Sequence, residues 1–292
     1  MNDRVNQAHP FVKSIGGKTQ LLPQILALAP QRINTYYEPF LGGGAVFWAL
    51  ANAGRIDRAV LNDANPLLMA TYRGVRNHVA QVIDCLGRYQ TQYSIAVHAD
   101  KGQALYLSVR DAQPAPTPSK DVETAAWYIF INKTCFNGLW RVNREGRFNV
   151  GWGKSVSPPI LDTENLRLCS QLLKCATLAS GDYRALTLKP GLGDFVYCDP
   201  PYAPGLSGKA GFTGFTSDKF TLDNQVELAQ QADLWRKRGA AVMLSNHATP
   251  DVLGMFAVQS PPWRLARVPA RRSVNSDGAG RGVVEELLIQ YP

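Results

Sequence analysis

Cysteine is scarce in this chain of 292 residues, and no two of its five cysteines form a CxxC pair. An odd number with this spacing supports neither a zinc site nor a framework of disulfide bonds. We therefore expect reduced and mostly buried thiols, as in a cytoplasmic protein, and no bound metal. The five are Cys85, Cys135, Cys169, Cys175 and Cys198.

Long apolar runs are also missing, since no stretch reaches 18 apolar residues, and we expect no membrane span. The first residues, MNDRVNQAHPF, lack the apolar core and the small-residue cleavage site of a secretory signal. Charged residues make up 18% of the chain and hydrophobic residues 45%, which excludes a disordered protein. These absences favour a globular protein that stays in the cytoplasm.

The charge that is present is mostly positive and unevenly distributed. Lys and Arg number 31 against 23 Asp and Glu, which gives a net charge of +8. Residues 127–154 and residues 264–281 each carry a net +4, and the remaining chain sums to zero. Clustered positive charge suits a polyanion such as nucleic acid, although a solvated basic face would have the same composition.

Strands and helices alternate in the first 78 residues and again after residue 175. This alternation is typical of βαβ units and predicts an α/β fold with a parallel, Rossmann-like sheet. The predicted strands are 36–40, 58–61, 176–179, 195–198, 241–244 and 286–290, and the predicted helices are 45–53, 222–238 and one that starts at Pro66.

The middle of the chain has a different pattern. Helical periodicity covers residues 79–93, 102–110 and 122–132, and a Pro-rich loop lies at 112–118. Residues 139–142 and 147–150 flank the turn at 143–146 and predict a β-hairpin. We therefore expect a discontinuous domain, 1–78 with 176–292, interrupted by a mostly helical insertion at 79–175.

The most specific motif is Asp199-Pro200-Pro201-Tyr202, directly after the predicted strand 195–198. Ligands of parallel sheets bind beyond the carboxyl ends of the strands, where this motif would lie. Two prolines stiffen the loop and remove two N–H donors. Asp199 and the Pro200 carbonyl can accept both hydrogens of an exocyclic amine while Tyr202 stacks on its ring. The alternative is an ordinary rigid turn.

A glycine-rich loop, Glu38-Pro39-Phe40-Leu41-Gly42-Gly43-Gly44, joins a predicted strand to a helix. It is neither GxGxxG, which argues against a dehydrogenase, nor a Walker loop. Its glycines allow close approach of a ligand, and Asp63 ends the next strand, where it can accept bonds from ribose hydroxyls. Together they favour a ligand of the adenosine type.

Two weaker signals accompany these motifs. Gly16-Gly17-Lys18 opens a helix, where backbone N–H groups and an ammonium can hold an anion. Gly181-Asp182-Tyr183 follows a strand and offers one more contact to an adenine, or simply a helix cap.

With these motifs the chain resembles the Dam-type DNA adenine-N6 methyltransferases over nearly its whole length. It carries FVKSIGGKTQLL, YYEPFLGGGAVF, LNDAN, SGDYRAL and VYCDPPY in the order of that family's alpha class. The resemblance implies S-adenosyl-L-methionine as cofactor, although Ser14 stands where the family often has tryptophan. The residues that it assigns to the cofactor are Ser14, Gly17, Lys18, Glu38, Phe40, Gly42, Gly44, Asp63, Asp182 and Asp199, and the catalytic residues are Asp199, Pro200, Pro201 and Tyr202.

The resemblance also implies a DNA reader in the predicted hairpin. In the family the stretch matching 136–141 contacts a GATC site and its arginine reads guanine, a role that suits Arg141. Gly151 stands where Dam has a proline. Other basic residues would contact phosphates, including a Gly/Ser-rich loop at 271–278. The expected DNA contacts are Lys133, Phe136, Asn137, Leu139, Arg141, Arg144, Arg147, Lys154, Arg271 and Arg272.

The sequence thus predicts a monomer or weak dimer that flips an adenine out of duplex DNA and methylates its N6. Alternatives are cytosine N4, an RNA adenine or a protein glutamine as acceptor, or a DNA-binding protein without activity. Asp199 favours adenine, because relatives acting on other amines more often have Ser or Asn there. His247, after the strand 241–244, is a candidate proton acceptor or a turn histidine. The sequence leaves open a restriction-modification or an independent role.

Overall fold

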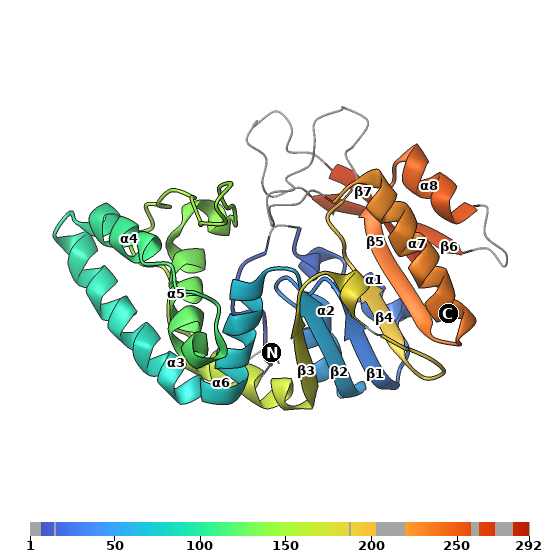
Figure 1. The fold of residues 1–292 in the computed structure, drawn as a ribbon, viewed down its shortest axis with the longest axis horizontal. Helices are drawn as coiled ribbons and strands as arrows, with labels where there is room; N and C mark the ends of the chain where they lie inside the picture. Colours follow the sequence, from blue (N-terminus) through green and yellow to red (C-terminus); the bar gives the residue numbers. More distant parts are fainter. Residues whose placement is uncertain are drawn as a thin grey trace.

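The computed structural model describes residues 7–14, 16–186, 188–202, 220–257, 263–271 and 283–291. Within them the strands form one sheet in the order β3-β2-β1-β4-β5-β7-β6 (Figure 1). The first five run parallel, and β7 is antiparallel to β5 and β6. The expected α/β sheet is confirmed. The strands are β1 Ile33–Glu38, β2 Ile56–Asp63, β3 Ala176–Ser180, β4 Phe195–Cys198, β5 Ala241–His247, β6 Arg264–Arg271 and β7 Val283–Tyr291.

Both faces of the sheet are covered, as a parallel sheet requires. Successive residues of a strand point to opposite faces. In β4, Phe195 and Tyr197 belong to the core formed with α1 (Leu22–Leu28) and α2 (Ala45–Asn52). Val196 and Cys198 belong to a second core with α7 (Leu222–Lys237) and α8 (Pro250–Ala257). The apolar run FVYC therefore forms a central strand buried on both sides.

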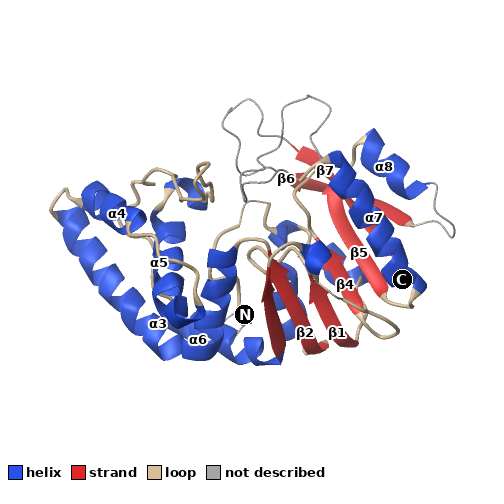
Figure 2. Ribbon diagram, viewed as in Figure 1, coloured by secondary structure: helices blue, strands red, loops and turns tan. Residues whose placement is uncertain are grey.

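The helices α3 to α6 gather beside the β3 edge of the sheet, and most of their residues fall in the range 79–175 that is predicted to be an insertion (Figures 1 and 2). They are α3 (Pro66–His98), α4 (Gly102–Asp111), α5 (Asp121–Thr134) and α6 (Thr163–Leu172). The long helix α3 is interrupted at His78 by a non-helical φ of −137° and ψ of 36°. This kink lies at the expected domain boundary, yet the core continues from the sheet through α3 into α5.

Close packing joins α3 to α5. A Cβ at Gly74 would lie 2.6 Å from the Asp121 carbonyl, so only glycine permits this approach. The Arg73 guanidinium also holds the Asp121 carboxylate through bonds of 2.9 and 2.8 Å. The short 3-10 helices are Lys18–Gln20, Pro118–Lys120, Phe136–Gly138, Leu173–Cys175 and Tyr183–Ala185.

Several sequence predictions need correction. The predicted hairpin is present in a short form: Gly146 N donates to Asn143 O in the turn, and the flanks pair at the Val142–Phe148 bridge. The backbone bonds from Asn143 N to Arg147 O and from Asn149 N to Arg141 O join the same flanks, although these are too short to be strands. β5 extends to His247, so this residue belongs to a strand rather than to a following turn. The helices α6 and α8 and the strand β6 were not predicted.

All five cysteines are free thiols, and Cys135, Cys169 and Cys198 are buried. Among the described helices, none combines the length and the hydropathy that a bilayer crossing demands.

Candidate active site

Four acidic residues lie at the carboxyl ends of four neighbouring parallel strands. Glu38 ends β1, Asp63 ends β2, Asp182 follows β3 by two residues, and Asp199 directly follows β4. These strands are adjacent in the order β3-β2-β1-β4, and their carboxyl ends share one edge of the sheet. The structure therefore gathers acidic residues from separate motifs, the most distant in sequence being Glu38 and Asp199, into one row of carboxylates.

Hydrogen bonds orient both oxygens of Asp199. Ser245 Oγ in β5 donates to Oδ1 at 2.8 Å, and Lys18 Nζ lies 2.8 Å from Oδ2. Because the only hydroxyl proton of Ser245 goes to Asp199, Tyr197 OH must donate to Ser245 Oγ, 3.0 Å away. The Asp199 carboxylate is thus fixed by Lys18 on one oxygen and by the two linked hydroxyls of Ser245 and Tyr197 on the other.

Lys18 lies among acidic and aromatic groups rather than facing solvent. Its side chain is only 6% exposed, and its Nζ donates to Gly16 O at 2.7 Å. The same Nζ is 3.9 Å from Glu286 Oε2 and 4.9 Å from the centre of the Tyr202 ring. Lys18 therefore contacts Asp199, Glu286 and Tyr202 together, and its assignment to the cofactor remains a prediction.

The Tyr202 ring is held at both its hydroxyl and its edge. Its OH donates to Glu286 Oε2 in β7 at 2.8 Å, and its ring meets His247 edge-on at 4.6 Å. Burial raises the pKa of Tyr202 well above its usual value, and the nearby charges of Asp199 and Glu286 raise it further. The hydroxyl therefore stays protonated and keeps its bond to Glu286.

The proline loop is tied to α7 and β5. Gln225 Nε2 donates to Pro201 O at 2.8 Å, and Asn246 Nδ2 donates to Gln225 Oε1 at 2.9 Å. Gln225 is 5% exposed, so this relay is buried. The loop is stiffened both by its own prolines and by two side chains from neighbouring elements.

The glycine loop is rigid and connected to Asp63. Gly42 has a φ of +50° and Gly44 of +67°, conformations that favour glycine. Gly42 N donates to Asp63 Oδ2 and Asn65 N to Oδ1, each at 2.9 Å. Burial raises the pKa of Asp63, and these two N–H groups oppose that shift. Tyr72 OH donates a hydrogen bond to the Gly42 carbonyl at 3.1 Å.

The remaining predicted residues of this edge line the same loop. A Cβ at Gly42 would lie 3.1 Å from Ser14 Oγ, so Ser14 packs on the loop. Phe40 lies at its other end, against Tyr183 at 5.0 Å between ring centres. Glu38 is 3% exposed, and its Oε2 has no hydrogen-bond partner among the described residues. Burial raises the pKa of Glu38 well above its usual value.

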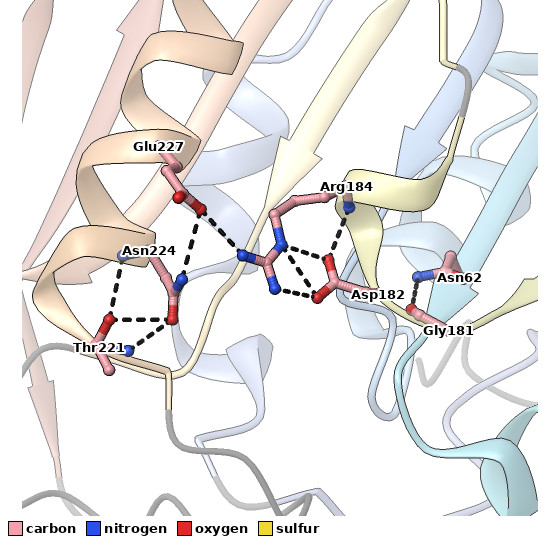
Figure 3. Close-up of polar contacts among 7 residues, drawn as sticks. All are labelled: Asn62, Gly181, Asp182, Arg184, Thr221, Asn224 and Glu227. Atoms are coloured by element: carbon pink, nitrogen blue, oxygen red, sulfur yellow. Dashed lines mark hydrogen bonds and ion pairs between the residues drawn. The ribbon is translucent and has the colours of Figure 1, made fainter.

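Asp182 is engaged by Arg184 (Figure 3). Its Oδ1 accepts from Arg184 N at 2.8 Å and from Nε at 3.0 Å, so it caps the short helix that follows. Arg184 reaches on to Glu227 Oε2 in α7 at 3.2 Å. The hydrogen bond from Arg184 lowers the pKa of Asp182. The guanidinium also binds Oδ2, so both oxygens of Asp182 are engaged, and its contact with a cofactor remains a prediction.

The predicted DNA contacts cluster on the segment after α5. Phe136 is 53% exposed, although it is a large aromatic residue, and Asn137 has a φ of +54°. Arg141 Nε donates to Asn149 Oδ1 at 2.8 Å, and an Arg147 nitrogen donates to Asp111 O at 2.7 Å.

The other predicted contacts differ in exposure. Arg144 and Lys154 are exposed and Leu139 is half-buried. Lys133 is half-buried too, and burial, with a smaller effect of nearby Lys13, lowers its pKa. Arg271 ends β6, and its side chain lies outside the described residues, as does Arg272.

Sequence reasoning missed the roles of Ser245, Gln225 and Glu286. Cys198 pairs with Leu244, so Asp199 and Ser245 follow at the same level of neighbouring strands. That relation could have been found only with the strand order in hand. Glu286 pairs with His247 across β5 and β7, and no local motif marks it. Within the described ranges, no group of three or more His, Cys, Asp or Glu side chains could hold a metal.

Comparison with known proteins identifies the family of this chain. The sequence profile of the D12 class N6 adenine-specific DNA methyltransferases matches residues 14–260. Type II methyltransferase M.MjaIII of Methanocaldococcus jannaschii is 36% identical over 98% of this chain and 100% of its own. DNA adenine methylases of Vibrio cholerae and Escherichia coli K12 are 32% and 31% identical over 96% of this chain and 95% and 94% of theirs. The chain therefore belongs to the D12 class of N6 adenine-specific DNA methyltransferases.

Proposed function

We propose that this adenine-specific DNA methyltransferase uses S-adenosyl-L-methionine, extrudes its target adenine from duplex DNA and recognises GATC. The observation that carries the first part is the row of four carboxylates along the sheet edge. Extrusion is needed because the adenine N6 is paired inside the stack.

The row suits a ligand that is rich in donors and positive charge. The cofactor carries an ammonium, a sulfonium, two ribose hydroxyls and an adenine amine, and each can meet a carboxylate. Glu38 offers a buried oxygen without a partner among the described residues, and Asp63 has oxygens already aligned by the glycine loop. Asp182 would accept from the adenine amine. When bound, the cofactor supplies a methyl group activated by positively charged sulfur.

Asp199 and Tyr202 would bind the target base. A neutral amine is a poor nucleophile while its lone pair is conjugated with the ring, and bonds to Asp199 and the Pro200 carbonyl would free that pair. Ser245 holds Asp199 Oδ1 in place, so Oδ2 is the oxygen that the amine would reach. Lys18 now contacts Oδ2 and would have to move toward the cofactor's carboxylate.

Recognition of GATC would rest on residues 136–141. Arg141 is exposed and can present two donors to guanine, while Arg144 and Lys154 would bind phosphates of any sequence. Once the base is bound, the alignment of its amine with the methyl group of the cofactor would account for most of the rate enhancement.

The test is to incubate plasmid DNA with enzyme and cofactor carrying a labelled methyl group, and to map modified bases individually. Label on the adenine of GATC alone supports the proposal, whereas label on every adenine removes its sequence-specific part. In parallel, Asp199→Ala should abolish transfer and retain DNA affinity in a fluorescence anisotropy assay. Full activity of Asp199→Ala would refute the role of Asp199. The exposed β2 residue Asp57, replaced by Ala, is the matched control.

A further inference from the structure

Three asparagines hold the segment from Ala8 to Lys13 by the same two-way pairing with its backbone. Asn52 in α2 pairs with Ala8 at 3.0 and 2.7 Å, and Asn165 in α6 pairs with His9 at 2.9 and 3.0 Å. Asn132 in α5 accepts from Lys13 N at 2.6 Å and donates to Lys13 O at 2.9 Å. Each amide thus satisfies both the N–H and the C=O of one residue, as a neighbouring strand would do in a sheet.

Asn132 differs from the other two because its amide also binds the turn at 136–138. Its Nδ2 also donates to Gly138 O at 3.4 Å, in the turn that carries Phe136 and Asn137. Both hydrogens of the amide are then used, one toward each stretch of chain. Asn132 is 2% exposed, so water does not compete for these bonds.

The two stretches that Asn132 joins also touch directly. A Cβ at Gly138 would lie 2.7 Å from Lys13 Cδ, so the Lys13 side chain packs against the turn. Beyond Lys13, Ser14 packs on Gly42 of the glycine loop, and Lys18 pairs with Asp199. Two residues five positions apart, Lys13 and Lys18, therefore contact the turn at 136–138 and Asp199 respectively.

We propose that Asn132 is a positioning residue that couples occupation of the turn at 136–138 to the placement of Lys18 beside Asp199. The inference rests on the proposed function, since it takes this turn to meet DNA and Asp199 to bind the target amine. DNA that moves the turn moves the Asn132 amide and, with it, the backbone of Lys13. Correct DNA thereby favours the departure of Lys18 from Asp199.

The test compares Asn132→Asp with Asn165→Asp in the full-length enzyme. Both variants lose the amide donors to the same segment, but only Asn132→Asp loses the bond to the turn. Single-turnover methylation is measured on a duplex with the recognition site and on a duplex with one base pair changed. Folding is checked by thermal unfolding, and DNA affinity by anisotropy. Asn132→Ser, which is neutral, serves if Asn132→Asp does not fold.

Asn132→Asp should lower the ratio of the two rates about tenfold, within the usual range of coupling between sites, and change DNA affinity much less. Asn165→Asp should leave the ratio unchanged. A folded Asn132 variant with the wild-type ratio, or an equal loss in both variants, overturns the coupling alone. A wild-type enzyme that does not distinguish the two duplexes overturns the proposed recognition and this inference together.

Discussion

Lys18 Nζ lies 2.8 Å from Asp199 Oδ2, and the two side chains are 6% and 23% exposed. The ammonium occupies the position at which an exocyclic amine would donate to this carboxylate, and it stands 4.9 Å from the centre of the Tyr202 ring. Under the proposed function, Lys18 and the target base would compete for the same acceptor. Such competition would make Lys18 part of the reaction cycle as well as of the ion pair seen here.

Replacing Lys18 by Met should destabilise the protein and lower its activity. Removing one partner of a buried ion pair leaves the other charge uncompensated, which costs about 3–5 kcal/mol. Urea unfolding followed by circular dichroism measures this loss in the free energy of unfolding. Lys120→Met, at a half-exposed lysine, should cost less than about 1 kcal/mol. Equal effects of the two substitutions would show that the Lys18–Asp199 pair is not an important contact.

Ser245→Ala should slow methyl transfer by about tenfold, the effect of losing one hydrogen bond to a charged group. Without the 2.8 Å bond from Ser245 to Oδ1, the Asp199 carboxylate is less well fixed, and its Oδ2 is less well oriented toward the amine. The fall should appear in kcat rather than in KM for DNA. Tyr197→Phe removes the next bond of the chain without touching Asp199, and should have a smaller effect. A larger loss with Tyr197→Phe would contradict the assigned order of these contacts.

Local motifs predicted the strand β4 and the site loops because their signals are contiguous. The run FVYC is buried on both faces, and Asp199 follows it at once. Ser245 and Glu286 reach the site only through the pairing of β5 with β4 and β7. Such long-range pairing depends on the register of strands far apart in the chain, and no single segment encodes it.

Tertiary packing helps to hold the short hairpin of residues 141–149. Trp140 stacks on Tyr128 of α5 at 4.5 Å, and Phe148 lies 5.0 Å from Trp140. Attachment to a helix, together with the pairing of its two flanks, therefore fixes this segment. The missed helix α6 had a local signal, because Asp162 caps it by accepting from Asn165 N at 3.1 Å.

Asp182→Ala should weaken cofactor binding about tenfold and hardly change stability. One lost hydrogen bond to an adenine amine corresponds to roughly 1.4 kcal/mol. The Asp182–Arg184 pair is about half exposed, so solvent screens it and its loss should cost less than about 1 kcal/mol of unfolding free energy. Isothermal titration of S-adenosyl-L-methionine without DNA measures the affinity. The control is Glu227→Ala, which removes the other acidic partner of Arg184 and leaves Asp182 in place. Unchanged affinity of Asp182→Ala would exclude this adenine contact.

Glu38 should give the stability of the enzyme a dependence on pH. Burial raises the pKa of Glu38 well above the value of 4.5 that it has in an unfolded chain. Between these two pKa values the folded state keeps a proton that the unfolded state releases. The free energy of unfolding therefore falls as pH rises through this window, by up to about 1.4 kcal/mol per pH unit. Below 4.5 both states are protonated and the contribution is constant.

Glu38→Gln removes this titration and keeps the shape of the side chain. The difference in the free energy of unfolding between Glu38→Gln and the wild type should therefore shift in favour of the variant as pH rises above 4.5. Urea unfolding of both proteins at a series of pH values, without cofactor, provides the comparison. Two curves that stay parallel from acid to neutral pH would show that Glu38 titrates normally. The same variant should bind the cofactor more weakly at neutral pH, because an amide cannot neutralise an ammonium as a carboxylate can.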